Sequence, residues 1–394
     1  MWLLRRSLIE VFRQAFFKNI IFGILPQTFF EQNIFVCGEA LLKFFAKPFF
    51  KKAVFFKKAV DFFCAAEYYY IKLRKKGVRG MTFIDLQTGR ETMLPADATL
   101  SCAVGNFDGV HIGHAALLSK AAEKDGCTLG SAWTFRTHPR ICMNTLDTTI
   151  LTSLDQKLEL FKKSGLDIAV LCDFFDVKNY SPEKFITDIL YEQCRVRRAV
   201  CGYNFRFGRF AAGTEKDFVA LFGGLGVTAY ALPPVKTAED ENVSSSLIRR
   251  RIEKGEVAAA ARLLGHPFQI RLPVTEGRKL GRRIGIPTIN QIFPANYAIP
   301  RFGVYACKCN VDGEEYIGVS NVGVRPTVFE HAETVNCETH ILDFSGWLYG
   351  KTVSVDFYEF IRPEKKFESL DALVQAIHGD INAVREIFCK EGAE

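Results

Sequence analysis

The chain has 394 residues, of which 48% are hydrophobic and 24% charged, so its composition is that of a globular protein of two or three domains. Its net charge of +7 does not indicate a nucleic-acid-binding surface. Residues 1–80 hold 15 basic and 5 acidic residues, and the other 36 basic and 39 acidic residues give the remainder a charge of −3. The 12 cysteines form no CxxC pair, which argues against a zinc ribbon or a thioredoxin-like motif and favours a reducing, cytoplasmic location.

Residues 1–80 are unusual because they hold 15 of the 36 phenylalanines. They contain neither the run of about 20 apolar residues that spans a membrane nor a clear signal-peptide cleavage site. The hexapeptide FFKKAV occurs in tandem at residues 49–54 and 55–60. Six residues turn a helix by about 600°, so this repeat does not keep one helical face. We expect Met81 to be the true start and residues 1–80 an upstream extension; an amphipathic helix on a membrane surface is the alternative.

From residue 100 to 235, short apolar runs alternate with amphipathic stretches. The apolar runs predict strands at 100–104, 129–135, 168–172, 199–201 and 227–232, after a first strand at 82–85. The amphipathic stretches predict helices at 115–124, 154–164, 182–193 and 215–222, and two more follow at 246–254 and 257–264. This βαβ alternation predicts a parallel, doubly wound, Rossmann-like α/β sheet.

The pattern changes after Pro267, because strand-like runs now follow one another without helices between them. The runs lie at 304–311, 315–321, 334–342 and 352–361, and a last helix is predicted at 370–388. Successive strands of this kind favour a closed antiparallel β-barrel, since closure removes exposed edges. We therefore expect a domain boundary near residue 268, between domains at 81–267 and 268–394.

The segment GNFDGVHIGH at residues 105–114 follows the strand predicted at 100–104 and opens a helix. In open α/β sheets, ligands bind at the carboxyl ends of strands. Gly105 and Gly109 allow the backbone to approach a nucleotide closely. His111 and His114 are three residues apart, so both can face a phosphate at the helix N-terminus and donate hydrogen bonds to developing charge. This predicts a nucleotide-phosphate site; a turn with two ordinary surface histidines is the less favoured interpretation.

Two further segments are candidates for the same site. Ser244 and Ser245 precede a predicted helix, so they can cap it, and their amides and hydroxyls suit phosphate oxygens. Arg249 adds a positive charge one turn into that helix. Asn204 would supply a polar contact beside the apolar rings of two neighbouring phenylalanines.

Candidate metal ligands lie in the second half of the chain. Thr288 and Asn290 are two residues apart, so an extended segment places both on one face, and Mg²⁺ prefers oxygen ligands such as theirs. A turn begun by Pro287 is the simpler interpretation of this segment taken alone. Glu338 lies on a predicted strand, where an isolated glutamate would usually face solvent.

Together these segments resemble those of the bifunctional riboflavin kinase/FMN adenylyltransferases, the bacterial FAD synthetases. In the first half, TFRTHPR, GYNFRFG and VSSSLIR, which begin at residues 134, 202 and 243, are similar to the family's TFxPHPR, GxNFRFG and ISSTxIR. In the second half, GRRIGIPTIN is similar to the family's GRxLGFPTAN. Further riboflavin kinase segments follow in order, at 303–305, 321–327, 338–340, 342–344, 349–350 and 361–364. The resemblance covers about residues 82–390.

The resemblance implies an FMN adenylyltransferase domain of the HxGH superfamily at 81–267 and a riboflavin kinase domain at 268–394. These would phosphorylate riboflavin to FMN and adenylylate FMN to FAD with release of pyrophosphate, using ATP and Mg²⁺. The implied catalytic residues are His111, His114 and Glu338, the last removing the proton of the ribityl hydroxyl. The implied ATP-binding residues of the first domain are Gly105, Phe107, Asp108, Gly109, Asn204, Ser244, Ser245 and Arg249. In the second domain, those implied for ATP or flavin are Gly281, Arg282, Pro287 and Arg325, and those for the metal are Thr288 and Asn290.

Three residues depart from the family pattern. Ile289 replaces the usual alanine beside the expected metal ligands, and Leu272 and Glu276 stand where glycine and histidine are usual. These departures leave the efficiency of the kinase half an open question.

Three alternatives compete with this interpretation. The HIGH tetrapeptide at 111–114 also occurs in class I aminoacyl-tRNA synthetases, but a Lys-rich KMSKS loop is missing and the acidic body is a poor tRNA surface. Adenylyltransferases for other phosphate esters lack the barrel half. A flavin-binding regulator with a decayed kinase half is disfavoured by the retention of Thr288, Asn290 and Glu338. We therefore expect small-molecule partners and no nucleic acid, with membrane contact only if residues 1–80 form an amphipathic helix.

Overall fold

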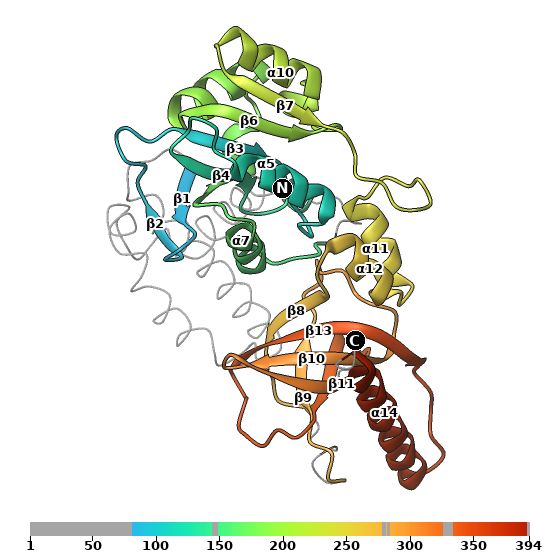
Figure 1. Cartoon of the computed structure of the whole chain (residues 1–394). Coiled ribbons are helices and arrows are strands. Elements are labelled where there is room, and N and C mark those ends of the chain that lie inside the picture. The colour runs from blue at the N-terminus through green and yellow to red at the C-terminus, as the bar shows by residue number, and fades with distance from the viewer. Residues whose placement is uncertain (1–80, 144–148, 278–280, 282–283, 326–333, 392–394) are drawn as a thin grey trace, which may run out of the picture. The chain divides into compact units, whose positions relative to one another are not determined.

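The computed structural model describes residues 81–143, 149–277, 281, 284–325 and 334–391. Gly80–Glu394 forms one compact unit (Figure 1). The two interpretations of residues 1–80 concern residues outside the described part of the chain. In the part that is described, we find no helix with both the length and the apolar character needed to cross a bilayer.

The first sheet has seven strands in the order β2-β1-β5-β4-β3-β6-β7 (Figure 1). Five of them are parallel: β3 (Leu100–Val104), β4 (Leu129–Phe135), β5 (Ile168–Cys172), β6 (Val196–Gly202) and β7 (Thr228–Leu232). Every residue of β3 and β5 is buried. In β3, Cys102 belongs to the hydrophobic cluster on one face of the sheet and Ala103 to the cluster on the other. The predicted doubly wound sheet is confirmed, because both faces are covered.

An antiparallel edge extends this parallel sheet. It consists of β1 (Met81–Asp85) and β2 (Arg90–Thr92), which form a hairpin. The Asp85 side chain accepts hydrogen bonds from the backbone of the turn, and β1 then pairs antiparallel with β5. A strand was predicted here, but its direction was not, because that direction is set by pairing with the distant β5.

Helices connect the parallel strands, and two more follow the last of these strands. Their bounds are α5 (Ile112–Ala122), α6 (Pro139–Cys142), α7 (Leu154–Lys163), α8 (Phe174–Val177), α9 (Pro182–Lys184), α10 (Glu215–Gly224), α11 (Ser245–Glu253) and α12 (Val257–Leu264). A capping box of Ser153 and Gln156 fixes the start of α7. The helix predicted at 182–193 is instead α9 followed by a π-helix, Phe185–Gln193, and a 3₁₀ turn lies at Arg209–Ala211. The wider π turn is not visible in hydrophobic periodicity.

The second sheet has six strands in the order β8-β13-β10-β11-β12-β9, and all its ladders are antiparallel. The strands are β8 (Phe268–Pro273), β9 (Ile289–Ile292), β10 (Gly303–Val311), β11 (Glu314–Arg325), β12 (Thr334–Ile341) and β13 (Thr352–Pro363). The edges approach each other through a bridge between Thr275 and Asn290. The Gln291 amide also donates to the carbonyl oxygens of Leu272 and Val353, at 2.7 and 2.8 Å. The predicted barrel is thus confirmed as a nearly closed one.

The barrel strands bury side chains on two faces. In β10, Tyr305 and Cys307 point into the barrel core, whereas Val304 and Ala306 pack against the final helix, α14 (Leu370–Glu391). The Arg362 guanidinium of β13 holds Asp380 of α14 through two hydrogen bonds of 2.8 and 2.7 Å. Helix α14 therefore covers the outer face of β10 and β11 (Figure 1).

Helices α11 and α12 share their hydrophobic cluster with the barrel. Ile248 and Ile252 of α11, and Val257 and Leu264 of α12, lie in the same cluster as barrel residues such as Phe357. The secondary structure changes near residue 268 as expected, but the core is continuous there. The domain boundary near residue 268 stays a prediction.

Candidate active sites

The loop between β3 and α5 is folded tightly at the carboxyl end of the parallel sheet. Its φ angles are +49° at Phe107, +85° at Gly109 and +40° at Val110, a region that side chains rarely adopt. A Cβ atom at Gly109 would lie 2.8 Å from Leu151 Cδ1. The Phe107 ring is completely buried. Glycine at 109 is therefore required both by the backbone conformation and by the close approach of Leu151.

His111 and His114 are stacked at the N-terminus of α5. His111 is the N-cap, and its Nδ1 accepts a hydrogen bond from the backbone N–H of His114 at 3.2 Å. The ring centroids are 3.6 Å apart, and the His114 ring meets that of Phe107 edge-on at 5.3 Å. Since Nδ1 of His111 is an acceptor, the proton of the neutral ring is on Nε2, which can donate to a ligand. The structure thus brings together the two histidines predicted for this site.

Both histidines are uncharged at neutral pH. Burial lowers the pKa of His111 to about 4, and the nearby Asp108 carboxylate offsets only part of this effect. Burial, followed by the repulsion that a protonated His111 and the Lys157 ammonium would exert, holds the pKa of His114 well below its usual 6.5. These rings can therefore stabilise negative charge as N–H donors rather than as cations.

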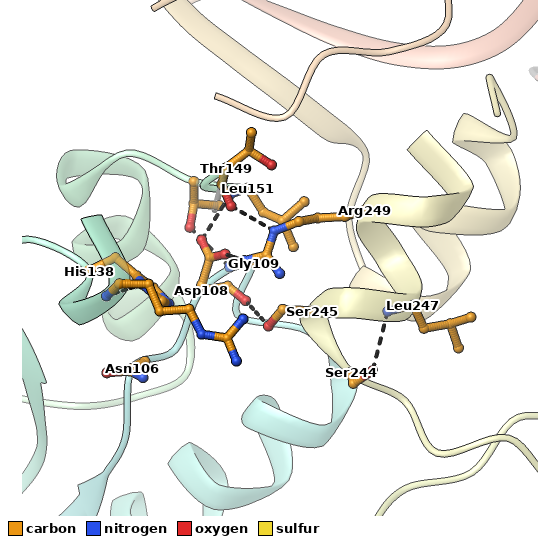
Figure 2. A network of polar contacts seen from close by, with 12 residues as sticks. Asn106, Asp108, Gly109, His138, Thr149, Leu151, Ser244, Ser245, Leu247 and Arg249 are labelled. Carbon is orange, nitrogen blue, oxygen red and sulfur yellow. Dashed lines mark hydrogen bonds and ion pairs between the residues drawn. The ribbon is translucent and has the colours of Figure 1, made fainter. Parts of the chain in front are cut away.

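Asp108 joins three segments of the chain (Figure 2). Its carboxylate forms an ion pair with Arg249 and accepts a hydrogen bond from the backbone N–H of Leu151 at 2.9 Å. Its backbone carbonyl accepts a hydrogen bond from the Ser245 hydroxyl at 2.9 Å, and Ser244 caps the first turn of α11. The serine segment and the histidine loop therefore meet, although more than a hundred residues separate them. The Asp108 carboxylate is buried and is already used to hold Arg249 and Leu151.

The segment from Thr149 to Thr152 is hydrogen-bonded to the same loop. The Thr149 carbonyl accepts a hydrogen bond from Nε of Arg249 at 2.6 Å, and the Thr152 hydroxyl accepts one from the backbone N–H of Gly109 at 3.1 Å. These contacts hold the loop and α11 to the segment that precedes α7.

The other side of this segment is bonded to the chain that follows β9. The backbone N–H of Ile150 donates to the Asn296 carbonyl at 2.7 Å, and the Ile150 carbonyl accepts from the backbone N–H of Ala298 at 2.9 Å. Ile150 and Tyr297 thus form a short parallel bridge. The α/β sheet region and the barrel region share this stretch of backbone.

A cavity of about 170 Å³ lies beside this network. Asp108, Arg136, His138, Thr152 and Lys157 are among its lining residues. Burial lowers the pKa of His138 to about 4, so this ring is also neutral at pH 7. Arg136, His138 and Lys157 are the basic residues of the cavity lining. The one carboxylate, that of Asp108, is paired with Arg249.

Asn204 lies just beyond the carboxyl end of β6, the strand next to β3. Its side chain is exposed, in keeping with a position at the rim of a site. The neighbouring Phe205 and Phe207 rings are stacked with centroids 5.4 Å apart, and Phe207 is buried against Phe218 in the core. Of this pair, Phe207 is therefore part of the sheet's packing.

A row of polar side chains crosses the barrel strands. Asn290 of β9 and Asn321 of β11 are the direct partners of Glu338 on either side of β12. Directly opposed residues share one face of a sheet, and this is the outer face, because the adjacent Cys337 is in the barrel core. The Asn336 amide donates to Glu338 Oε1 at 3.1 Å, and the Asn321 amide donates to Glu364 Oε1 at 2.9 Å. The predicted base thus faces the predicted metal ligand Asn290.

A tight turn precedes β9. The backbone N–H of Ile286 donates to the Gly281 carbonyl at 2.8 Å, and a Cβ atom at Gly281 would lie 2.2 Å from the Ile286 carbonyl oxygen. The Thr288 hydroxyl lies 3.5 Å from that same Cβ position. Nδ1 of His340 donates to the Pro287 carbonyl at 2.7 Å, which ties the turn to β12. Gly281, Pro287, Thr288 and Asn290 are thus brought close to the strand of Glu338, while Arg282 and the side chain of Arg325 lie outside the described part of the chain.

Comparison with known proteins identifies both halves. Residues 94–247 match the family model for FAD synthetase, and residues 264–388 match that for riboflavin kinase. Three relatives named bifunctional riboflavin kinase/FMN adenylyltransferase are similar along most of their length. They come from Listeria monocytogenes (33% identity, 73% of this chain and 92% of the relative), Bacillus subtilis (35%, 71% and 89%) and Escherichia coli K12 (36%, 72% and 91%). The chain belongs to the bifunctional riboflavin kinase/FMN adenylyltransferase family.

A solved structure shares this fold. A crystal structure named as a macrolide-efflux protein from Streptococcus pneumoniae aligns with 76% of this chain and 97% of its own, with a TM-score of 0.66 and 27% identity. As a member of the family, the chain is an enzyme that converts riboflavin to FMN and FMN to FAD. This excludes the three alternatives: an aminoacyl-tRNA synthetase, an adenylyltransferase for another phosphate ester, and a flavin-binding regulator.

Two of the three departures from the family pattern are accommodated in the barrel core, whereas Glu276 is exposed. Ile289 packs against the core cluster, whereas its neighbours Thr288 and Asn290 alternate with it and so face the other way. Leu272 is also buried in that core, where it pairs with Val353. The added bulk at these two positions therefore points away from the expected kinase site.

Sequence reasoning missed Lys157 and His340. Lys157 occupies the apolar stripe of α7, three residues after Leu154 and four before Phe161, both of which pack in the core. A lysine at such a helical position is a detectable signal, because a charged side chain is then forced into the interior. His340 had no such signal, since its partner is a backbone carbonyl contributed by a distant turn.

Proposed function

We propose that the two reactions occur at the two groups of residues described above, adenylylation at the histidine loop and phosphorylation at the barrel row. The observation that supports the first assignment is the stacked pair His111 and His114, placed at a helix N-terminus where the serine cap of α11 also meets the loop. A helix N-terminus attracts phosphate. Loop backbone from Gly105 to Gly109, with Ser244 and Ser245, would enclose the ATP phosphates.

In adenylylation, the FMN phosphate attacks the α-phosphorus of ATP and pyrophosphate leaves. Neutral His111 and His114 donate N–H hydrogen bonds to the oxygens on which charge develops. No covalent intermediate is expected, because the Ser245 hydroxyl, which reaches this loop, donates to the Asp108 carbonyl rather than to a base. Arg249 serves mainly to orient Asp108 and the loop, while Asn204 and Phe107 shape the rim and floor of the site.

In phosphorylation, Glu338 accepts the proton of the ribityl hydroxyl as that oxygen attacks the γ-phosphorus of ATP. Gly281, Arg282, Pro287 and Arg325 would hold ATP and flavin around the turn before β9. The described residues contain no cluster of three or more His, Cys, Asp or Glu that could hold a metal alone. Two neutral oxygens, from Thr288 and Asn290, fit Mg²⁺ that keeps waters and binds mainly through substrate phosphates, and Mg²⁺ would neutralise phosphate charge there.

The assignment is tested by measuring both half-reactions on one preparation of the His114→Ala variant. The protein is incubated with riboflavin, ATP and Mg²⁺, and FMN and FAD are separated by chromatography. FAD formation should stop while FMN accumulates, because only the adenylylation site is altered. FAD formation at the wild-type rate would show that adenylylation occurs elsewhere.

The domain limits complete the proposal. We assign adenylylation to residues 81–267 and phosphorylation to 268–394, in a cytoplasmic enzyme in which residues 1–80 are dispensable. A chain that begins at Met81 should therefore retain both activities. If residues 1–80 are instead a membrane anchor, only the full chain will sediment with lipid vesicles.

A further inference from the structure

Lys157 is a buried lysine that the reactions described so far do not use. It lies in the first turns of α7 with 7% of its surface exposed. Its ammonium group donates a hydrogen bond to the carbonyl of Asn106, at 2.8 Å, in the histidine loop. It therefore reaches from α7 into the adenylylation site.

The charge of Lys157 is poorly compensated. Within the described part of the chain its hydrogen-bond partner is a neutral carbonyl, and the nearby Asp108 carboxylate is already held by Arg249 and the Leu151 amide. Burial lowers the pKa of Lys157 to about 8, which the Asp108 charge only partly offsets. A buried cation is costly unless an anion accompanies it. The position is one that a bound anion would stabilise.

The cavity beside Lys157 has the composition and the size for that anion. Arg136, His138 and the Thr152 hydroxyl line it together with Lys157. Its volume of about 170 Å³ is below the 300–1,000 Å³ typical of pockets that enclose a whole small molecule. It is large enough for one phosphate group of a nucleotide that extends outward.

We propose that Lys157 binds a phosphate oxygen of a reacting nucleotide during adenylylation. This proposal rests on the assignment of adenylylation to the histidine loop. The phosphate belongs either to FMN or to the leaving pyrophosphate of ATP, which share the same chemistry. Among the described residues the ammonium group bonds to Asn106 alone, which leaves two N–H donors for either phosphate. It also adds a positive charge to a site whose two histidines are neutral.

The test compares Lys157→Met and Lys157→Arg with Lys163→Met, which removes an exposed lysine from the end of the same helix. FAD formation from supplied FMN is measured while FMN and ATP are varied separately. Lys157→Met should lower kcat/KM by about 10- to 150-fold, the effect of one hydrogen bond to a charged group. Lys157→Arg should restore part of it, and Lys163→Met should change nothing. A raised KM for FMN would show that Lys157 binds the FMN phosphate, and a raised KM for ATP would show that it binds the pyrophosphate moiety of ATP.

Inhibitors of the adenylylation half-reaction distinguish phosphate binding by Lys157 from a purely structural role. Inorganic pyrophosphate contains phosphate groups, whereas adenosine contains none. If Lys157 contacts the pyrophosphate moiety, Lys157→Met weakens inhibition by pyrophosphate and leaves inhibition by adenosine intact. If it contacts FMN, both inhibition constants stay constant and the KM for FMN alone rises. Equal weakening of both inhibitors, or kinetics equal to those of Lys163→Met, would overturn the proposal.

His114→Ala, assayed beside these variants, keeps the two proposals distinct. Should His114→Ala still make FAD, the assignment of the site is wrong. Should it lose FAD formation while Lys157→Met retains it, only the role of Lys157 is wrong. Riboflavin phosphorylation by the same preparations should be unchanged throughout and reports that the protein is folded.

Discussion

Asn290 and Glu338 are direct partners in the antiparallel ladder of β9 and β12, with both side chains on the outer face of the barrel. Cross-strand partners of this kind have Cβ atoms about 5 Å apart. An amide oxygen that suits a metal and a carboxylate that suits a proton are thus adjacent, and the Asn336 amide also donates to the Asn290 oxygen at 3.4 Å. The Asn336 amide, at 3.1 Å, further fixes the Glu338 carboxylate.

Glu338→Gln should lower riboflavin phosphorylation by about 10²–10⁴-fold, because the amide keeps the side-chain shape but cannot accept the proton. The KM for riboflavin should change little. Adenylylation of supplied FMN by the same protein should stay at the wild-type rate. Unchanged phosphorylation would remove Glu338 as the base, and loss of both reactions would indicate misfolding.

Gly277→Ala should impair the kinase half alone. A Cβ atom at Gly277 would lie 2.4 Å from Nδ2 of Asn290, so the alanine must displace this amide. Overpacking of this kind costs about 1–3 kcal/mol. We expect a higher Mg²⁺ concentration for half-maximal phosphorylation. Gly223→Ala is the matched control, because nothing lies within 4 Å of its Cβ position; equal Mg²⁺ curves for the two variants would contradict the role of Asn290.

Asp108→Asn should destabilise the protein and reduce FAD formation. The Asp108 and Arg249 side chains are 4% and 13% exposed, and breaking a buried ion pair costs about 3–5 kcal/mol. Chemical unfolding measures the loss. The control is Asp312→Asn, which breaks the exposed pair of Asp312 and Lys351 at a cost of no more than about 1 kcal/mol. Similar decreases in the free energy of unfolding of the two variants would mean that the buried pair does not stabilise the loop.

Stability should fall as the pH is lowered below about 6.5. Burial holds the pKa values of His111 and His138 at about 4, compared with 6.5 in the unfolded chain. Between these values the unfolded chain binds more protons, so the free energy of unfolding decreases with decreasing pH and is unaffected well above pH 6.5. Thermal unfolding of the ligand-free protein from pH 7.5 to 5 measures this slope. His111→Gln should flatten it, and the same change at exposed His378 should not; equal slopes would refute the effect.

Much of this architecture could be predicted from the sequence, because buried strands have short, mainly apolar sequences. The bounds of β3, β4 and β5 agree with the prediction at both ends. The direction of β1 and the π-helix at Phe185–Gln193 could not be predicted, since short turns and helix type leave no periodic signal. At the sites, the pairing of His111 with His114 followed from local spacing. The contact of Asp108 with Arg249 depends on tertiary structure and could not be derived that way.

The backbone bridge at Ile150 and Tyr297 bears on how freely the two halves could be exchanged between relatives. Its hydrogen bonds join main-chain groups, so a chimera that combines halves from two species would retain them whatever side chains it carries. The pair of Arg271 and Glu159 depends on side-chain identity and would need both partners from one parent. Recombination across residue 268 is therefore constrained by this charge pair and by the shared hydrophobic cluster, while the link that reaches the histidine loop does not depend on side chains.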